Sequence, residues 1–357
     1  MEDRKKIKVL LINNGYPSAS CPNYCTYIES IHECLNEAGF DVELLVIKYS
    51  KINLFVKIVN YILFWKKILF IDLSHYDLIY LNHPPYAFPV FFNKTFLLKK
   101  LYCHWHGNEL ISKNIIIAMI RRAFKEKFIK AIHIVPSDYY KKKLICSFKE
   151  NRMRVLISPS GGVDVQLFND ENRIINSVFN VAFASSLTFD KGADLFMEIV
   201  RCKKYIENQS ACHLCFTVID YGKDSDYFKI KLLELDPTLC IVHKCPKDKM
   251  PLFYKSVDLL LMPSIREGES LGLVALEAMS CNIPVIAYDI CAFNEFIHSG
   301  ISGELVELLP DKEKSIQGFT NAIIEIIRHY NSYIPREIVL KKYSKQVVVD
   351  FYKSLLY

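Results

Sequence analysis

The sequence predicts an α/β protein made of two doubly wound domains, each a parallel sheet with helices on both faces. Three observations support this. The chain has 357 residues, a length that suits two domains of ordinary size. Short apolar runs of strand length alternate with segments of helical spacing. The alternation stops over residues 158–173 and then starts again, which predicts a linker and a cleft between two domains.

The first half begins with a strand, a helix and a second strand. Residues 8–12 (KVLLI) are an apolar run that ends at the turn signal Asn-Asn-Gly of residues 13–15. Residues 27–38 have apolar side chains at helical spacing, and residues 42–47 predict the next strand. Further strands are expected over 78–81, 100–105 and 132–135, with a helix over 114–130. The first turn lacks the pattern G-x-G-x-x-G, which disfavours a dinucleotide dehydrogenase.

The second half repeats the same alternation. Strands are expected over 178–184, 214–219, 240–243, 259–262 and 284–287. A helix should begin near Ser270 and end at Cys281, and a last helix should cover 343–356. We therefore expect domains at 1–170 and 171–336, with residues 337–357 packing back on the first domain.

Composition and cysteine pattern favour a cytoplasmic globular protein. Apolar residues make up 51% and charged residues 24%, which excludes a mostly disordered chain. The twelve cysteines are scattered, and a chain this long can bury its core without disulfides, so we expect reduced thiols. Residues 1–8 are charged and do not resemble a secretion signal. The apolar stretch 52–73 contains Lys57, Lys66 and Lys67, so we do not expect it to span a membrane.

Positive charge is concentrated in the first half. The whole chain carries +6, but residues 51–150 alone hold 17 Lys and Arg against 6 Asp and Glu, a balance of +11. Such a segment predicts an anionic partner, either nucleic acid or an acidic lipid surface. The aromatic and aliphatic residues between the lysines of 52–70 favour the membrane surface over nucleic acid.

Residues 263–287 (PSIREGESLGLVALEAMSCNIPVIA) carry the most informative pattern. A strand ends there, a polar loop follows, and Ser270, Leu271 and Gly272 place backbone N–H groups at a helix N-terminus, which suits a phosphate. Glu269 precedes the helix and Glu277 lies two turns along the same face, where a carboxylate can accept hydrogen bonds from paired hydroxyls. A solvated helix face with a capping acid explains the same spacing.

The spacing Glu269-x7-Glu277 resembles the E-x7-E signature of retaining glycosyltransferases of family 4, which have the GT-B fold of two Rossmann-like domains and a C-terminal crossover helix. His106-Gly107 is similar to the His-Gly loop of that family's first domain. The remaining matches stand in the family's order: Val135-Pro136-Ser137, the run 159–164 followed by Phe168, Lys191-Gly192, Pro263-Ser264, Glu295 and Gly303.

The resemblance implies a sugar transfer from a nucleotide-sugar donor with retention of the anomeric configuration. It implies that Glu277 binds the ribose, Glu269 the donor sugar and Lys191 the diphosphate. The amides of residues 270–272 would contact sugar and diphosphate, and His106 would reach across the cleft to the sugar. No metal or other cofactor is implied. With the basic segment, it suggests an envelope-polysaccharide or lipid-linked oligosaccharide acceptor at the inner face of the cytoplasmic membrane.

Three positions depart from the family pattern. Ser186 stands where the family usually has an arginine, so Arg266 becomes the candidate for the second cation at the diphosphate. Residues 20–23 replace paired glycines after the first strand, and residues 160–162 replace an Asn-Gly pair.

Two short motifs suggest a metal but are weak. Asp224-Ser225-Asp226 mimics a D-x-D metal motif in the wrong architecture, and Cys212 and Cys215 lack the second pair of ligands that a zinc site needs. Two other functions stay open at this point: a sugar-nucleotide epimerase on the same scaffold, which would need no acceptor, and a non-catalytic binding protein that lost activity with the missing arginine.

Overall fold

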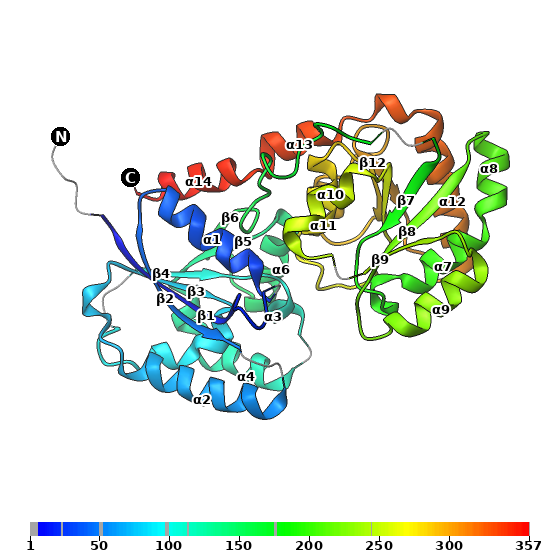
Figure 1. The fold of residues 1–357 in the computed structure, drawn as a ribbon. Helices are drawn as coiled ribbons and strands as arrows, with labels where there is room; N and C mark the ends of the chain where they lie inside the picture. The colour runs from blue at the N-terminus through cyan, green and yellow to red at the C-terminus, as the bar shows by residue number, and fades with distance from the viewer. Residues whose placement is uncertain are drawn as a thin grey trace. The chain divides into compact units, whose positions relative to one another are not determined.

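The structure is a computed structural model that describes residues 6–22, 24–49, 53–96, 100–112, 114–174, 177–243 and 245–356. The chain divides into two units (Figure 1). The first unit is Met1–Gly162 together with Lys345–Tyr357, and the second is Val163–Ser344. Each unit contains one parallel sheet with helices on both faces, as the alternating pattern predicts.

The sheet of the first unit has the strand order β2-β1-β3-β4-β5-β6. Its strands are β1 (Lys8–Tyr16), β2 (Asp41–Lys48), β3 (Leu78–Asn82), β4 (Lys100–His104), β5 (Ile132–Val135) and β6 (Arg154–Ile157). The central strand β3 is buried throughout, because helices cover both faces of a doubly wound sheet. β2 is added on one side of β1, and β3 to β6 are added in order on its other side. The strand order therefore reverses between β1 and β3.

Helices of the first unit form a separate apolar core on each face of the sheet. α1 (Thr26–Glu37) and α14 (Lys345–Ser354) cover one face through Ile31, Val348 and Tyr352 (Figure 1). The other face packs against α2 (Leu54–Phe70), α5 (Lys125–Ile129) and α6 (Asp138–Phe148), with η2 (Pro84–Phe92), a 3₁₀-helical segment. The remaining helical segments are η1 (Leu73–His75), α3 (Asn108–Ile111) and α4 (Ile115–Ala123).

The sheet of the second unit has the strand order β12-β11-β10-β7-β8-β9. Its strands are β7 (Phe179–Phe183), β8 (Leu214–Asp220), β9 (Cys240–His243), β10 (Leu259–Met262), β11 (Val285–Tyr288) and β12 (Gly303–Val306). β7 and β10 are neighbours, and the chain leaves them in opposite directions. The strand order therefore reverses between β7 and β10, which is where ligands bind in open α/β sheets.

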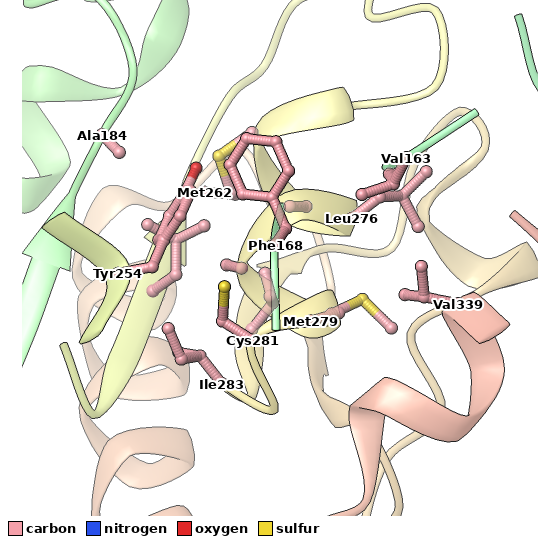
Figure 2. Close-up of a cluster of buried hydrophobic side chains, with 14 of the residues drawn as sticks. Val163, Phe168, Ala184, Tyr254, Met262, Leu276, Met279, Cys281, Ile283 and Val339 are labelled. Carbon is pink, nitrogen blue, oxygen red and sulfur yellow. The ribbon is translucent and has the colours of Figure 1, made fainter. Parts of the chain in front are cut away.

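Two cores also enclose the second sheet. One face is covered by α7 (Ala193–Arg201), α8 (Lys203–Ser210), α9 (Ser225–Leu235) and α12 (Lys312–Arg328). The other is covered by α10 (Met250–Lys255), α11 (Leu273–Ser280) and α13 (Pro335–Lys342). Figure 2 shows this second core, in which the ring of Phe168 lies among apolar side chains that include Leu276 and Met279.

The division between the units differs from the boundaries expected at 170/171 and 336/337. Val163 and Phe168 are buried in the core of the second unit, and the backbone N–H of Val163 donates to the carbonyl oxygen of Tyr343 at 2.8 Å. Tyr343 and Val339 belong to the same core (Figure 2 labels Val339). Residues 163–170 and 337–344 therefore belong to the second unit, and the helix that packs on the first unit begins at Lys345.

Several elements differ in extent from the sequence prediction. β1 continues to Tyr16 through an irregular pairing after Asn13. The helix expected over 114–130 is interrupted at Phe124, whose φ and ψ of −106° and 17° are not helical. α11 begins at Leu273 and not at Ser270, because Gly272 adopts the left-handed conformation with φ 65°.

Arg173 should stabilise the second unit. Its guanidinium donates to the carbonyl oxygen of Val257 at 2.9 Å and to Asp258 Oδ1 at 3.2 Å, and the Asp258 side chain is only 13% exposed. Arg173→Ala leaves this carboxylate largely buried without its cation, so the free energy of unfolding should fall by about 3 kcal/mol. Urea unfolding followed by circular dichroism measures this. The exposed pair of Arg201 and Glu198 gives the control, since Arg201→Ala should cost under about 0.5 kcal/mol; equal losses would contradict the prediction.

Candidate functional site

The predicted donor-binding residues gather where the strand order of the second sheet reverses. Lys191 lies in the loop after β7, and Glu269 in the loop after the neighbouring strand β10. Lys191 Nζ forms a hydrogen-bonded ion pair with Glu269 Oε2, and the hydroxyl of Ser264 donates to the same oxygen at 3.2 Å. Both charged side chains are 15% exposed, so the pair is shielded but remains within reach of solvent.

These two loops lie unusually close together because Gly192 has no side chain. A Cβ at Gly192 would lie 2.1 Å from the carbonyl oxygen of Pro263, and its φ of +80° favours glycine. The backbone N–H of Ile265 also donates to the carbonyl oxygen of Asp190, at 3.2 Å. The glycine after Lys191 thus allows the close approach that brings Lys191 to Glu269.

The loop before α11 carries the residues predicted to bind phosphate. Leu271 is buried in the core, and Gly272 caps the helix, where a Cβ would lie 2.8 Å from the Phe293 ring. The hydroxyl oxygen of Ser270 is buried and has no hydrogen-bond partner among the residues that the structure describes. A buried hydroxyl without a partner is costly, which is consistent with a polar group of a ligand reaching this loop.

Glu277 lies on α11 and is contacted by a buried tyrosine. The hydroxyl of Tyr254 donates to Glu277 Oε2 at 3.4 Å and to the carbonyl oxygen of Val274 at 3.1 Å. Burial, and secondarily the charge of Glu277, raises the pKa of Tyr254 well above its ordinary value, so the phenol stays neutral. Figure 2 shows Tyr254 in the apolar core to which Phe168 and Leu276 also belong.

Tyr221 links the two glutamates electrostatically. Burial raises its pKa to about 12, and the charges of Glu269 and Glu277 both contribute. The two carboxylates therefore act on one region of the protein. Sequence reasoning missed Tyr221 and Tyr254; the position of Tyr221, directly after β8, is the one signal that could have indicated it.

The other two residues predicted to bind the donor are Ser186 and Arg266. Ser186 is half-buried in the loop after β7, and the next residue, Leu187, donates its N–H to the carbonyl oxygen of Tyr221 at 2.7 Å. Arg266 is exposed in the loop after β10. The pKa of Asp190 is lowered first by the neighbouring Thr188 side chain and further by the charge of Arg266, so Arg266 acts near the Lys191 loop.

His106 of the first unit is buried in a cluster of histidines at the carboxyl end of its sheet. Its Nε2 lies 3.0 Å from Oδ1 of Asn82, and its backbone N–H donates to Glu109 Oε1 at 2.5 Å. The other oxygen of Glu109 lies 3.1 Å from Nδ1 of His83. The Tyr27 hydroxyl lies 2.5 Å from Nε2 of His83. Sequence reasoning found His106 but gave no role to these neighbours.

Burial keeps His106 neutral. Its pKa is lowered well below the ordinary value, first by burial and then by the neighbouring His104 and His83. The ring of His104 stacks on that of His106 with centroids 4.2 Å apart. At neutral pH His106 is therefore a hydrogen-bonding imidazole and not a cation.

The motifs that suggested metals have other partners. Asp226 pairs with Lys229 at 3.3 Å, and the Ser225 hydroxyl donates to Asp220. Among the described residues no group of three or more His, Cys, Asp or Glu side chains is arranged to hold a metal ion. All twelve cysteines are free thiols. Of the departures after β1, Asn23 lies outside the described residues.

The first unit exposes an apolar face on α2 and α4. Phe64 and Ile68 of α2 are buried in the core of the first unit, whereas Phe55, Ile62 and Phe70 are exposed, Phe55 at 76%. α2 and α4 both pack against η2. The rings of Trp65, Phe88 and Phe124 connect them, with centroids 5.4 and 5.8 Å apart. We call this surface the α2–α4 face. Its exposed apolar residues are Leu54, Phe55, Ile58, Val59, Ile62, Leu63, Phe70, Phe92, Ile115, Ile116 and Met119.

Basic residues border the α2–α4 face. Lys66 and Lys67 are exposed near the C-terminal end of α2, and Arg122 is exposed in the last turn of α4. In the described part of the chain, no helix has the length and apolarity needed to cross a membrane.

Known proteins resemble this chain in sequence. A protein of the cps region of Klebsiella pneumoniae is 24% identical over 229 residues, covering 62% of this chain and 60% of that protein. The capsular polysaccharide biosynthesis glycosyltransferase CapM of Staphylococcus aureus is 24% identical over 237 residues, with the same two coverages. The chain thus spans about 60% of the length of these relatives.

Solved structures resemble nearly the whole chain. Sucrose-phosphate synthase from Thermosynechococcus elongatus has a TM-score of 0.72 at 18% identity and covers 98% of this chain and 99% of its own. HepE from Anabaena, solved with UDP and glucose, has a TM-score of 0.68 at 16% identity with the same coverages. These likenesses confirm the predicted GT-B fold class. Residues 166–346, about half of the chain, match the family described as glycosyl transferases group 1, and the chain therefore belongs to that family.

Proposed function

We propose that the protein is a retaining glycosyltransferase of family 4, which transfers a sugar from a nucleotide-sugar donor to a glycan or lipid-linked acceptor. The observation that carries this is the Lys191–Glu269 pair where the strand order reverses, with Glu277 on the following helix. A cation and two carboxylates at one end of a sheet suit a ligand that has both phosphates and hydroxyls. The binding of UDP and glucose by HepE supports the same class of ligand.

The positive groups around the loops after β7 and β10 bind the diphosphate in this proposal. Lys191 supplies one cation, and the exposed Arg266 supplies the second in place of the arginine that Ser186 replaces. The N–H groups of residues 270–272, with the buried hydroxyl of Ser270, contact the diphosphate and sugar. No metal or other cofactor is needed, because these groups supply the opposing charge.

The two glutamates bind the hydroxyl groups of the donor. Glu277 accepts hydrogen bonds from the ribose, and the Tyr254 hydroxyl holds its carboxylate in place. Glu269 binds the donor sugar. In the free protein Glu269 is neutralised by Lys191. When the donor binds, its diphosphate therefore competes with Glu269 for Lys191. The sugar hydroxyls then donate hydrogen bonds to Glu269 in place of the lysine.

The reaction follows from these contacts. The bond between the anomeric carbon and the phosphate oxygen breaks, and the acceptor oxygen bonds to that carbon on the same face. The acceptor proton passes to the departing phosphate oxygen. Lys191 and Arg266 stabilise the charge on the leaving diphosphate, and Glu269 stabilises the positive charge on the sugar. His106 accepts a hydrogen bond from a sugar hydroxyl.

We propose that the acceptor is an envelope polysaccharide or lipid-linked oligosaccharide and that the first unit contacts an anionic membrane, from the cytoplasm, without crossing it. The relatives from capsule gene regions support the acceptor class. The α2–α4 face supports the membrane contact, since it combines exposed aromatic and aliphatic side chains with lysines at its border. Nucleic acid has less support, because apolar side chains do not favour a phosphate backbone.

The two alternative functions are not favoured by these findings. An epimerase would convert the nucleotide sugar with no acceptor and release no free nucleotide. A non-catalytic binding protein would bind the donor and leave it intact. Release of nucleoside diphosphate during incubation with the donor separates the proposed transferase from both.

A nucleotide sugar should stabilise the protein against heat. At a concentration of 100 Kd the correct donor should add about 2.7 kcal/mol, which a thermal-shift screen detects readily. Glu277→Gln should weaken donor binding by about 10- to 100-fold, because it removes a charge-assisted hydrogen bond. Glu198→Gln on the surface of α7 is the control and should leave the shift unchanged. If no nucleotide sugar shifts the melting temperature, the proposed donor class is wrong.

Loss of the diphosphate cations should slow turnover. Lys191→Ala should reduce kcat/KM by at least about tenfold, since one charge-assisted hydrogen bond is worth roughly 1.5–3 kcal/mol. Arg266→Ala should do the same, and Glu269→Gln should lower kcat more than it raises KM. Turnover is measured as nucleoside diphosphate release from the donor that stabilises the protein. Normal turnover of Lys191→Ala would remove the phosphate assignment, and normal turnover of Arg266→Ala would remove only the second cation.

The protein should bind anionic vesicles. Removing two surface lysines should weaken binding by about 30-fold, at roughly 1 kcal/mol for each charge, and high salt should act in the same direction. We therefore expect the double variant Lys66→Gln, Lys67→Gln to lose flotation with vesicles that contain phosphatidylglycerol. The matched control is Lys341→Gln, Lys342→Gln, two exposed lysines that end α13. Equal flotation with neutral vesicles, or equal loss in both double variants, would count against docking by the α2–α4 face.

A further inference from the structure

His106 is held by side chains from several elements of the first unit. Its ring lies between that of His104, at the end of β4, and that of Tyr27 on α1, with centroids 4.2 and 4.8 Å away. The ring of His83, which follows β3, is 4.6 Å away. Such enclosure leaves the imidazole little freedom to rotate. Its hydrogen-bonding character is then set by which nitrogen carries the proton.

Asn82 decides the position of that proton. Because His106 is neutral, one ring nitrogen carries hydrogen and the other has a lone pair. Oδ1 of Asn82 lies 3.0 Å from Nε2, and an amide oxygen can only accept a hydrogen bond. Nε2 therefore carries the hydrogen and Nδ1 the lone pair.

The backbone of His106 is fixed by a separate chain of contacts. Glu109 Oε1 accepts the backbone N–H of His106, and Glu109 Oε2 lies against Nδ1 of His83. Burial raises the pKa of Tyr27 well above its ordinary value, so Tyr27 keeps its proton, and its hydroxyl lies 2.5 Å from Nε2 of His83. The carboxylate of Glu109 is fully buried among these groups.

We propose that Asn82 is a positioning residue that holds His106 in its neutral Nε2–H form, so that Nδ1 can accept a hydrogen bond from a sugar hydroxyl during transfer. Glu109, with His83 and Tyr27, positions the same histidine through its backbone. The inference rests on the proposed function, in which His106 contacts a sugar. Asn82 ends β3, directly beside the point where the strand order of the first sheet reverses, so the pair lies where this fold binds ligands.

Nuclear magnetic resonance tests the proton position without any substrate. In protein labelled with ¹⁵N-histidine, the nitrogen shifts and their couplings to ring protons distinguish Nε2–H from Nδ1–H. We expect the Nε2–H form for His106, with His106→Gln identifying its signals. His133 is an internal reference: its Nδ1 accepts from Trp105 Nε1 at 2.9 Å, and its Nε2 donates to the Phe128 carbonyl oxygen at 2.8 Å. Its signals should stay the same in every Asn82 variant.

Two substitutions of Asn82 separate positioning from a structural role. Asn82→Ala removes the acceptor, so His106 should populate both tautomers and kcat should fall by about tenfold or more, with the donor KM within about threefold. Asn82→Asp keeps an oxygen at the same place but adds a charge beside His106, which raises its pKa. Near neutral pH this variant is partly imidazolium, so its kcat should rise with pH more steeply than that of the natural protein.

The charged and titratable groups around His106 are His104, His83, Glu109 and Tyr27. None of these residues is substituted in the Asn82 variants, so a change in pH profile reports on position 82. Asn93→Ala is the matched control, because Asn93 is another buried asparagine of the first unit and donates to the carbonyl oxygens of Ile68 and Ile71. It should lower the melting temperature and leave kcat and the His106 signals unchanged.

Three results would overturn the proposal: an Nδ1–H tautomer of His106 in the natural protein, an unchanged tautomer and kcat in Asn82→Ala, or the same pH profile for Asn82→Asp and the natural protein. If Asn82→Ala does not fold, the first and third results still decide. Failure of the proposed function looks different. In that case no nucleotide sugar is turned over, while the tautomer of His106 still depends on Asn82.

Discussion

The candidate site of the second unit depends on the close approach of two loops, which a glycine makes possible. Gly192 sits against the carbonyl of Pro263, and no side chain could be placed there without moving the backbone. This contact brings the end of the β7 loop to the start of the β10 loop, so that Lys191 and Glu269 meet. The strand order around β7 and β10 puts the same loops next to the first turn of α11. Charge, helix terminus and carboxylate are thus brought together by backbone geometry.

In the first unit, buried polar side chains lie together at the carboxyl end of the sheet. Asn82 and His104 end neighbouring strands and are paired across the sheet, and both are buried. A sheet edge that is buried and polar must satisfy its hydrogen bonds internally, and most of these groups do so through Glu109, Tyr80 and Tyr27. Within the described part of the chain, the amide nitrogen of Asn82 and Nε2 of His104 have no hydrogen-bond partner, which is consistent with bound water or a ligand group there.

The sequence predicted the elements whose pattern is local. β5, β9 and β10 begin and end where their apolar runs do, and β5 and β10 are almost wholly buried, as short apolar runs in a covered parallel sheet are. β6 and β12 were not predicted, because neither strand is a continuous buried apolar run: β6 begins with the exposed Arg154, and β12 contains the half-buried Glu304. The unit boundary was misplaced because Val163 and Phe168 look like linker residues until the contact with Tyr343 is known.

The sequence indicated the charged residues of the candidate site, but it did not indicate the neighbouring side chains that contact them. Glu269 and Glu277 were proposed from their spacing and Lys191 from the family resemblance, and the order of the strands brings the loops that carry Lys191 and Glu269 together. Tyr221, Tyr254 and Asn82 were not recognisable, since each acts through a contact between elements far apart in sequence. No local pattern distinguishes a tyrosine that holds a carboxylate from one that fills a core.

The outward face of α2 has a consequence for the behaviour of the purified protein. Its apolar residues lie on the side of the helix away from the core, and they continue through Phe92 to α4. Removing this apolar surface from water is favourable, so the α2–α4 face promotes association between copies of the chain. Repulsion between the lysines opposes this, and salt screens that repulsion. Concentrated solutions without detergent should therefore be least colloidally stable at high ionic strength, the reverse of what is usual for proteins that associate through opposite charges.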